Sequence, residues 1–158
     1  LSKMSKSIPS SELKLCENNA IDGVAGHYYH RYKDLEIPCV FKLELPKELS
    51  VSEIDICLVL SNLLENALEA SMRTAPDKRR ITVFARMHSD NVVLIKVENF
   101  YNGVVKEKNG IFESSKHSGE GIGTQSVRRI AEKGGGYCRF TQKDSIFTAD
   151  VMLRGKSK

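Results

Sequence analysis

The sequence has few cysteines and no long apolar run. No stretch approaches the roughly 20 apolar residues that a membrane-spanning helix needs, and the N-terminus lacks the apolar core of a signal peptide. We therefore expect the chain as given to be soluble. It begins with Leu1 rather than Met, which indicates a piece of a longer protein with room for a membrane region upstream.

The four cysteines, Cys16, Cys39, Cys57 and Cys138, are widely separated and show no C-x-x-C spacing. Cys57 lies among helical leucines and Cys39 in a strand-like run, so both are expected to be small buried hydrophobes. This pattern favours reduced thiols, as in the cytosol.

The chain also lacks a strong charge of one sign. Its 24 Lys and Arg against 20 Asp and Glu leave a net charge of +4, and the basic residues are scattered. Nucleic-acid binding is therefore not the first hypothesis. The length of 158 residues, with 41% apolar and 28% charged residues, fits one soluble domain with a real core.

A polar strip interrupts an apolar helical run at Cys57-Leu-Val-Leu-Ser-Asn62-Leu-Leu-Glu-Asn66-Ala-Leu-Glu69-Ala70. At about 100° per residue, one narrow face of this helix carries Asp55, Asn62, Asn66, Glu69 and Arg73. Two asparagines one turn apart among leucines predict a covered polar site, in which each amide needs a partner. The alternative is the solvated outer face of an amphipathic helix.

Hydrophobic periodicity predicts helices over 17–36, 52–72 and 121–133, and strands over 40–45, 80–88, 92–99, 137–142 and 146–153. Ser52 with Asp55 fits a capping box at the start of the second helix. Residues 1–15 are expected to be a linker remnant and 16–158 one domain. Hairpins that alternate with helices predict an α+β fold: a two-layer α/β sandwich whose mostly antiparallel sheet is covered by helices on one face.

Residues 100–120 show no clear periodicity, and this length inside a compact domain predicts a mobile lid. Three alternating glycines, Gly119, Gly121 and Gly123, then open the third helix. Glycine lets backbone N–H groups and the helix dipole approach an anion, so phosphate is the expected ligand. A tight turn is the alternative.

Two common nucleotide motifs are absent from the sequence. Thr124 occupies the third-glycine position of G-x-G-x-x-G, and no strand precedes the motif. The Gly-Lys-Ser at 155–157 has Asp150 where a P-loop needs its first glycine. Neither a dinucleotide-binding fold nor a P-loop protein is predicted.

The asparagine-bearing helix, the lid and the glycine-rich helix start, in this order, resemble the GHKL ATPases, which include sensor histidine kinases, DNA gyrase B, Hsp90 and MutL. Residues 62–70 are similar to the N-box and 119–123 to the second glycine box. The resemblance covers about 16–153 and implies the Bergerat, or histidine-kinase ATPase, fold. Within this superfamily, residues 127–136 are most similar to the kinases of peptide quorum-sensing systems in Gram-positive bacteria.

The resemblance implies ATP and Mg²⁺ as cofactors. Asn66 would coordinate the Mg²⁺ that bridges the phosphates, and Asn62 would support the phosphates or metal-bound water. Asn62 stands where gyrase-like relatives carry a hydrolytic Glu, which favours phosphoryl transfer over hydrolysis. Glu65 joins Asn62 as a candidate catalytic residue, with a surface carboxylate as the alternative. The implied ATP-binding set is Asn62, Asn66, Glu69, Asn99, Gly103, Lys116, Gly119, Gly121, Ile122 and Gly123.

The first glycine box departs from the family's D-x-G-x-G, since it is Asn99-Phe-Tyr-Asn-Gly103 here. Asn99 replaces the adenine-binding Asp, and Tyr101 replaces the first glycine. An amide oxygen accepts the hydrogen bond without charge assistance, so weak nucleotide affinity is expected. In the lid, Lys116 is the candidate to neutralise γ-phosphate charge, with a solvated lysine as the alternative.

A histidine kinase also needs a phospho-acceptor histidine, and none of His27, His30, His88 and His117 fits that role. The acceptor and dimerisation helices are therefore expected upstream of Leu1. The resemblance implies a monomeric, cytoplasmic catalytic fragment, itself without membrane or nucleic-acid contact, of a homodimeric, membrane-anchored kinase that serves a response regulator. The alternatives are a gyrase- or MutL-type ATPase and a degenerate, non-catalytic nucleotide-binding module.

Overall fold

The computed structural model describes the backbone of residues 13–101, 107–108, 111–112 and 118–155, and the side chains of 13–101 and 123–155. The elements in chain order are α2 (Asn19–Asp34), β1 (Cys39–Glu44), α3 (Glu53–Met72), the 3-10 turn η1 (Pro76–Lys78), β2 (Ile81–Ser89), β3 (Val92–Phe100), β4 (Glu107–Lys108), β5 (Ile111–Phe112), α4 (Ser118–Lys133), β6 (Tyr137–Lys143) and β7 (Ile146–Arg154). Within these ranges, no helix is long and apolar enough to cross a membrane.

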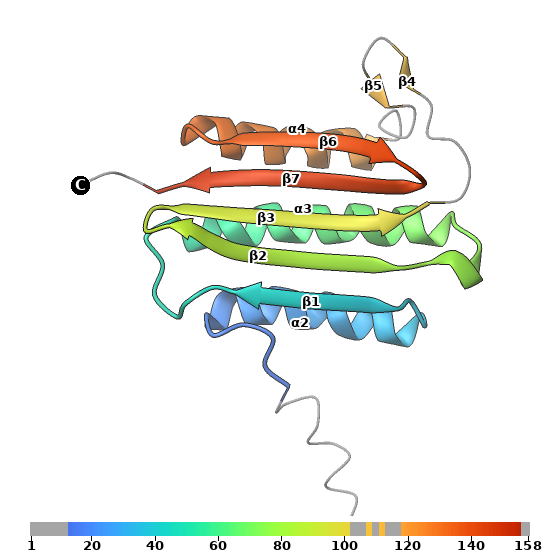
Figure 1. Ribbon diagram of the computed structural model, residues 1–158, viewed down its shortest axis with the longest axis horizontal. Coiled ribbons are helices and arrows are strands. Elements are labelled where there is room, and N and C mark those ends of the chain that lie inside the picture. The colour runs from blue at the N-terminus through green and yellow to red at the C-terminus, as the bar shows by residue number, and fades with distance from the viewer. Residues whose placement is uncertain (1–12, 102–106, 109–110, 113–117, 156–158) are drawn as a thin grey trace, which may run out of the picture.

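The main sheet has five strands in the order β1-β2-β3-β7-β6. β1 and β2 run parallel, while the other neighbours are antiparallel. Helices α2, α3 and α4 lie side by side on one face of this sheet, with α3 between the other two (Figure 1). The predicted α+β sandwich, mostly antiparallel and covered on one face, is confirmed.

The alternation of side chains along β3 explains the two layers. Val93, Ile95 and Val97 are almost fully buried toward the helices, whereas Lys96, between them, is exposed on the other face. A period of two fits a strand with one packed and one open face. The core therefore lies between the sheet and the helices.

Helix α3 begins and ends where its sequence signals place it. The Ser52 hydroxyl accepts the backbone N–H of Asp55 at 3.2 Å, as a capping residue does. Its apolar side is buried against the sheet and the flanking helices through Ile56, Val59, Leu60, Leu63, Leu64, Ala67 and Leu68. This packing fixes the direction in which the polar strip points.

Helix α4 begins at Ser118, three residues before the predicted start at residue 121. Glycine disfavours helix interiors, which is why the sequence predicted a later start. Tertiary packing outweighs that preference here, because Val127 and Ala131 of the same helix are fully buried. Gly119, Gly121 and Gly123 consequently lie inside the first turns of α4.

The predicted lid is only partly covered by the structure, through the short antiparallel pair β4–β5. Gly103 and Lys116 fall outside the described residues, as do 1–12 of the expected linker. The hairpin between β6 and β7 turns on Asp144 and Ser145, whose φ values are 53° and 67°. Positive φ at both central residues is the pattern of a two-residue hairpin turn.

Candidate functional site

The two predicted constellations, the asparagine strip and the glycines, meet between α3 and α4. A Cβ built on Gly123 would lie 3.4 Å from Oδ1 of Asn62 and 3.9 Å from Oδ1 of Asn66. Both asparagines are half-buried. The glycine thus leaves space beside two amide oxygens that any side chain at position 123 would begin to fill.

The first turn of α4 precedes Gly123 in the same helix. Gly119, Gly121 and Ile122 lie in this part of the helix, and α4 packs against α3. The first N–H groups of a helix have no partner inside the helix, and its dipole makes this end positive. An anion at this terminus would therefore meet N–H donors of the helix.

Asn99 lies at the end of β3, where it is 4% exposed. Its neighbours in the sheet are Ile81 on β2 and Phe147 on β7, and its Nδ2 donates to the Phe100 carbonyl at 3.3 Å. The end of β3, the C-terminal end of α3 and the start of α4 lie at the same end of the molecule (Figure 1). Asn99 is therefore a buried amide at the end of the sheet where α3 ends and α4 begins.

Tyr101, which stands in the first-glycine position, is tied to the β6–β7 hairpin. Its hydroxyl donates to Oε1 of Gln142 at 3.1 Å, and its backbone N–H donates to the Ser145 carbonyl at 2.9 Å. The departure from the glycine box thus has a structural explanation, because the tyrosine anchors the chain where it leaves β3.

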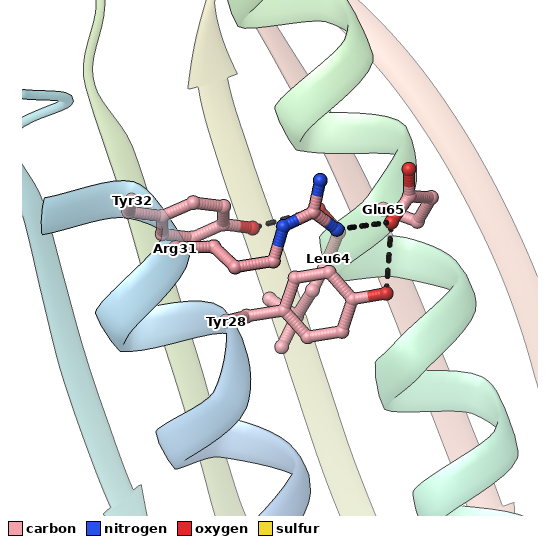
Figure 2. Close-up of polar contacts among 5 residues, drawn as sticks. All are labelled: Tyr28, Arg31, Tyr32, Leu64 and Glu65. Atoms are coloured by element: carbon pink, nitrogen blue, oxygen red, sulfur yellow. Dashed lines mark hydrogen bonds and ion pairs between the residues drawn. The ribbon is translucent and has the colours of Figure 1, made fainter. Parts of the chain in front are cut away.

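Glu65 faces α2. Its Oε1 accepts from the Tyr28 hydroxyl at 2.9 Å and from Nη1 of Arg31 at 3.3 Å, as Figure 2 shows. Beside it, the Tyr32 hydroxyl donates to the Leu64 carbonyl at 2.7 Å. We call these five residues, Tyr28, Arg31, Tyr32, Leu64 and Glu65, the Glu65 cluster. Burial, followed by the hydrogen bond to Glu65, raises the pKa of Tyr28 to about 12.

Sequence reasoning missed two features of this site. The aromatic residues of α2 are regularly spaced, but nothing in that spacing names Glu65 as their partner. Ser71 lies on the buried side of α3, and among the described side chains its Oγ is the one buried polar atom without a hydrogen-bond partner. A serine within the apolar positions of a helix is a signal that was available in the sequence.

The remaining strip residues show no protein-built metal site. Among the residues that the structure describes, no three His, Cys, Asp or Glu side chains come together as a metal-binding group. Glu69, half-buried on α3, has polar or charged interactions of its own. A metal ion at this place would rely on amide oxygens and on the ligand's own phosphates, as Mg²⁺ commonly does.

Comparison with protein families gives a match to a model described as GHKL domain, over residues 51–154. A comparison with curated proteins gives no significant match.

Among solved structures, the chain is similar to histidine kinase domains. The nucleotide-free catalytic domain of histidine kinase ThkA superposes with a TM-score of 0.66 at 16% identity, over 89% of this chain and 94% of that one. The mycobacterial sensor histidine kinase MprB gives 0.58 at 17% identity, over 89% and 96%. The kinase domain of a blue-light activated histidine kinase from Erythrobacter litoralis gives 0.60 at 16% identity, over 82% and 57%. These likenesses establish a shared fold.

Proposed function

The chain belongs to the GHKL domain family, and we propose that it is the ATP-binding catalytic domain of a two-component sensor histidine kinase. The observation that carries this proposal is the approach of Gly123 to the amide oxygens of Asn62 and Asn66. Gly123 is far from both asparagines in the sequence, and the three residues come together where α4 packs against α3.

The asparagines supply neutral oxygen ligands to the proposed site. Asn66 would hold the Mg²⁺ through its amide oxygen, and Asn62 would support the phosphates through its amide N–H groups or through metal-bound water. The N–H groups at the start of α4, around Gly119 and Gly121, would bind phosphate oxygens, with Ile122 and Gly123 lining the same site. When bound, the metal ion neutralises charge on the phosphates. An amide cannot act as a strong base, so Asn62 favours transfer of the γ-phosphate over hydrolysis.

The buried Asn99 is assigned to the adenine, whose amino group donates to its Oδ1. Without a negative charge this hydrogen bond is weaker than that of an Asp, so we expect modest affinity. Glu69, Gly103 and Lys116 complete the proposed ATP-binding set. Glu65 is not part of this set, because its contacts lie on the α2 side.

The phosphoryl acceptor in this proposal is a histidine outside the fragment. We take residues 16–158 as the catalytic domain and 1–15 as part of a linker to a dimerisation domain. The whole protein would be a membrane-anchored homodimer with this domain in the cytoplasm, acting on a response regulator. A crystal structure of ThkA in complex with the response regulator TrrA is a precedent for that partner. Membership in the quorum-sensing kinases is part of the same proposal.

Titration with a fluorescent ATP analogue, with Mg²⁺ and with EDTA, tests the nucleotide site. We expect binding that Mg²⁺ strengthens, and loss of that strengthening in Asn66→Ala. Asn19→Ala, an exposed asparagine on α2, is the matched control and should bind as the wild type does. If binding to Asn66→Ala depends on Mg²⁺ as much as binding to the wild type does, Asn66 is not the metal ligand. If the wild type binds no adenine nucleotide at millimolar concentration, the non-catalytic module is favoured.

Turnover by the isolated chain separates the kinase from the gyrase-type ATPase. We expect very slow release of inorganic phosphate, since no acidic residue occupies the Asn62 position. Steady ATP hydrolysis by the isolated chain would contradict the kinase assignment.

A further inference from the structure

Helix α3 is fixed to α2 at two successive residues. The Leu64 carbonyl accepts from Tyr32, and the Glu65 carboxylate accepts from Tyr28 and Arg31 (Figure 2). The next residue along the helix is Asn66, whose amide oxygen faces Gly123 on the opposite flank. One turn of α3 therefore connects the Glu65 cluster to the asparagine site.

We propose that Glu65 is a positioning residue: through Tyr28 and Arg31 it sets the rotation of α3 that presents Asn62 and Asn66 to the metal and the phosphates. The inference rests on the proposed function, and it gives Glu65 a role other than that of a base at the reacting phosphate.

Small rotations of α3 matter because metal coordination tolerates little displacement. An amide oxygen about 6 Å from a helix axis moves about 1 Å when the helix turns by about 10°. Metal–ligand distances in working sites are held within roughly 0.2 Å. Apolar packing alone permits shifts of this size between helices, whereas hydrogen bonds to two adjacent residues restrict both rotation and sliding.

The two donors to Glu65 are not equivalent. Arg31 and Glu65 are 43% and 40% exposed, and an ion pair with this exposure contributes little because water screens it. The Tyr28 hydroxyl makes the shorter contact with Glu65, at 2.9 Å, and the Tyr28 ring is half-buried. A hydrogen bond from a fixed ring to a charged acceptor has strength and direction. We therefore assign most of the positioning to Tyr28.

The Mg²⁺-dependent gain in nucleotide affinity of the 158-residue chain is the test. Tyr28→Phe and Glu65→Gln should each reduce this gain by about tenfold, with a much smaller change of affinity in EDTA, because the amide oxygens lose their alignment with the metal. In the Tyr28→Phe/Glu65→Gln double variant the loss should be no larger than in Tyr28→Phe alone, since Glu65→Gln only removes the charge from a contact whose donor Tyr28→Phe has already removed. Arg31→Gln should have a smaller effect.

Tyr29→Phe is the matched control. It removes a hydroxyl from the same helix and keeps the ring that packs edge-on against Phe41. Its Mg²⁺-dependent gain should equal that of the wild type.

The possible outcomes separate the two proposals. A wild type without Mg²⁺-dependent nucleotide binding would overturn the proposed function, and this inference with it. If the wild type binds as expected while Tyr28→Phe and Glu65→Gln keep the full Mg²⁺-dependent gain, the positioning role alone is overturned. An equal loss of affinity with Mg²⁺ and with EDTA, accompanied by a lower melting temperature, would also overturn it, because that pattern belongs to general destabilisation.

Discussion

The two flanks of α3 are built in opposite ways. Toward α2, the helix is attached through aromatic hydroxyls and a guanidinium at Leu64 and Glu65. Toward α4, a glycine without a side chain faces Asn62 and Asn66. The first flank restricts movement and the second leaves space. Together they let one amphipathic helix serve both as a structural member and as the floor of the proposed site.

Removal of the buried ring on the α2 flank should have the largest effect on stability. Tyr32 is fully buried, and Tyr32→Ala deletes a large aromatic side chain together with its hydrogen bond to Leu64. We expect a loss of about 3–5 kcal/mol in the free energy of unfolding, measured by urea denaturation. Tyr32→Phe keeps the ring and should cost about 1 kcal/mol. Similar losses for the two variants would show that the hydroxyl, and not the packing, dominates this flank.

Gly123→Ala on the α4 flank should separate stability from binding. Alanine favours the helix over glycine by about 0.5–1 kcal/mol, and the added Cβ makes ordinary contacts at 3.4 Å or more. The variant should therefore be slightly more stable in urea but bind the ATP analogue more weakly, because the Cβ occupies the space beside Asn62 and Asn66. Unchanged nucleotide affinity would mean that the ligand does not approach this glycine.

Alkaline pH should weaken the α2 flank through the Tyr28 hydroxyl. The pKa of Tyr28 is raised to about 12, above its ordinary value near 10, so the folded state favours the neutral hydroxyl. This contribution is complete below about pH 10 and is lost as the pH rises toward 12. Tyr28→Phe should show a shallower fall in stability across that window, measured by urea denaturation at several pH values. Burial raises the pKa of Tyr32 in the same direction, so part of the slope will remain. An unchanged slope of stability against pH in Tyr28→Phe would mean that ionisation of the Tyr28 hydroxyl does not contribute to unfolding at alkaline pH.

Ser71→Ala should have the smallest effect. The hydroxyl is buried and unpartnered, so its removal leaves no broken hydrogen bond and should change stability by less than about 1 kcal/mol. A clear loss of nucleotide affinity in this stable variant would show that a ligand or a bound water uses the hydroxyl. A large loss of stability would contradict the assignment of Ser71 as unpartnered.

Helix α3 could be predicted from the sequence because several local signals agree. Ser52 supplies the cap, the leucines supply the period, and Pro76 follows soon after the end. The start of α4 could not be placed correctly, since glycine's weak helix preference opposed the packing of Val127 and Ala131. Local signals locate an element well when propensity and packing favour the same boundary.

The candidate site was only partly accessible to such reasoning. Asn62, Asn66 and Gly123 followed from spacing and resemblance, although their proximity required the fold. The contact of Tyr28 with Glu65 spans 37 residues, and regularly spaced aromatics are equally explained by core packing. Ser71 resembles any small residue in an apolar position. Contacts between side chains on separate helices depend on helix rotation, which a sequence pattern does not specify.

The parallel pairing of β1 with β2 has a consequence for the order of folding. Parallel neighbours cannot be joined by a tight turn, and here α3 lies in the connection between them. The edge of β2 that faces β1 is therefore paired only when α3 has packed against the sheet and brought β1 alongside, and β1 then forms the edge of the sheet. Because this connecting helix carries Asn62 and Asn66, completion of the sheet and assembly of the proposed nucleotide floor depend on the same packing step.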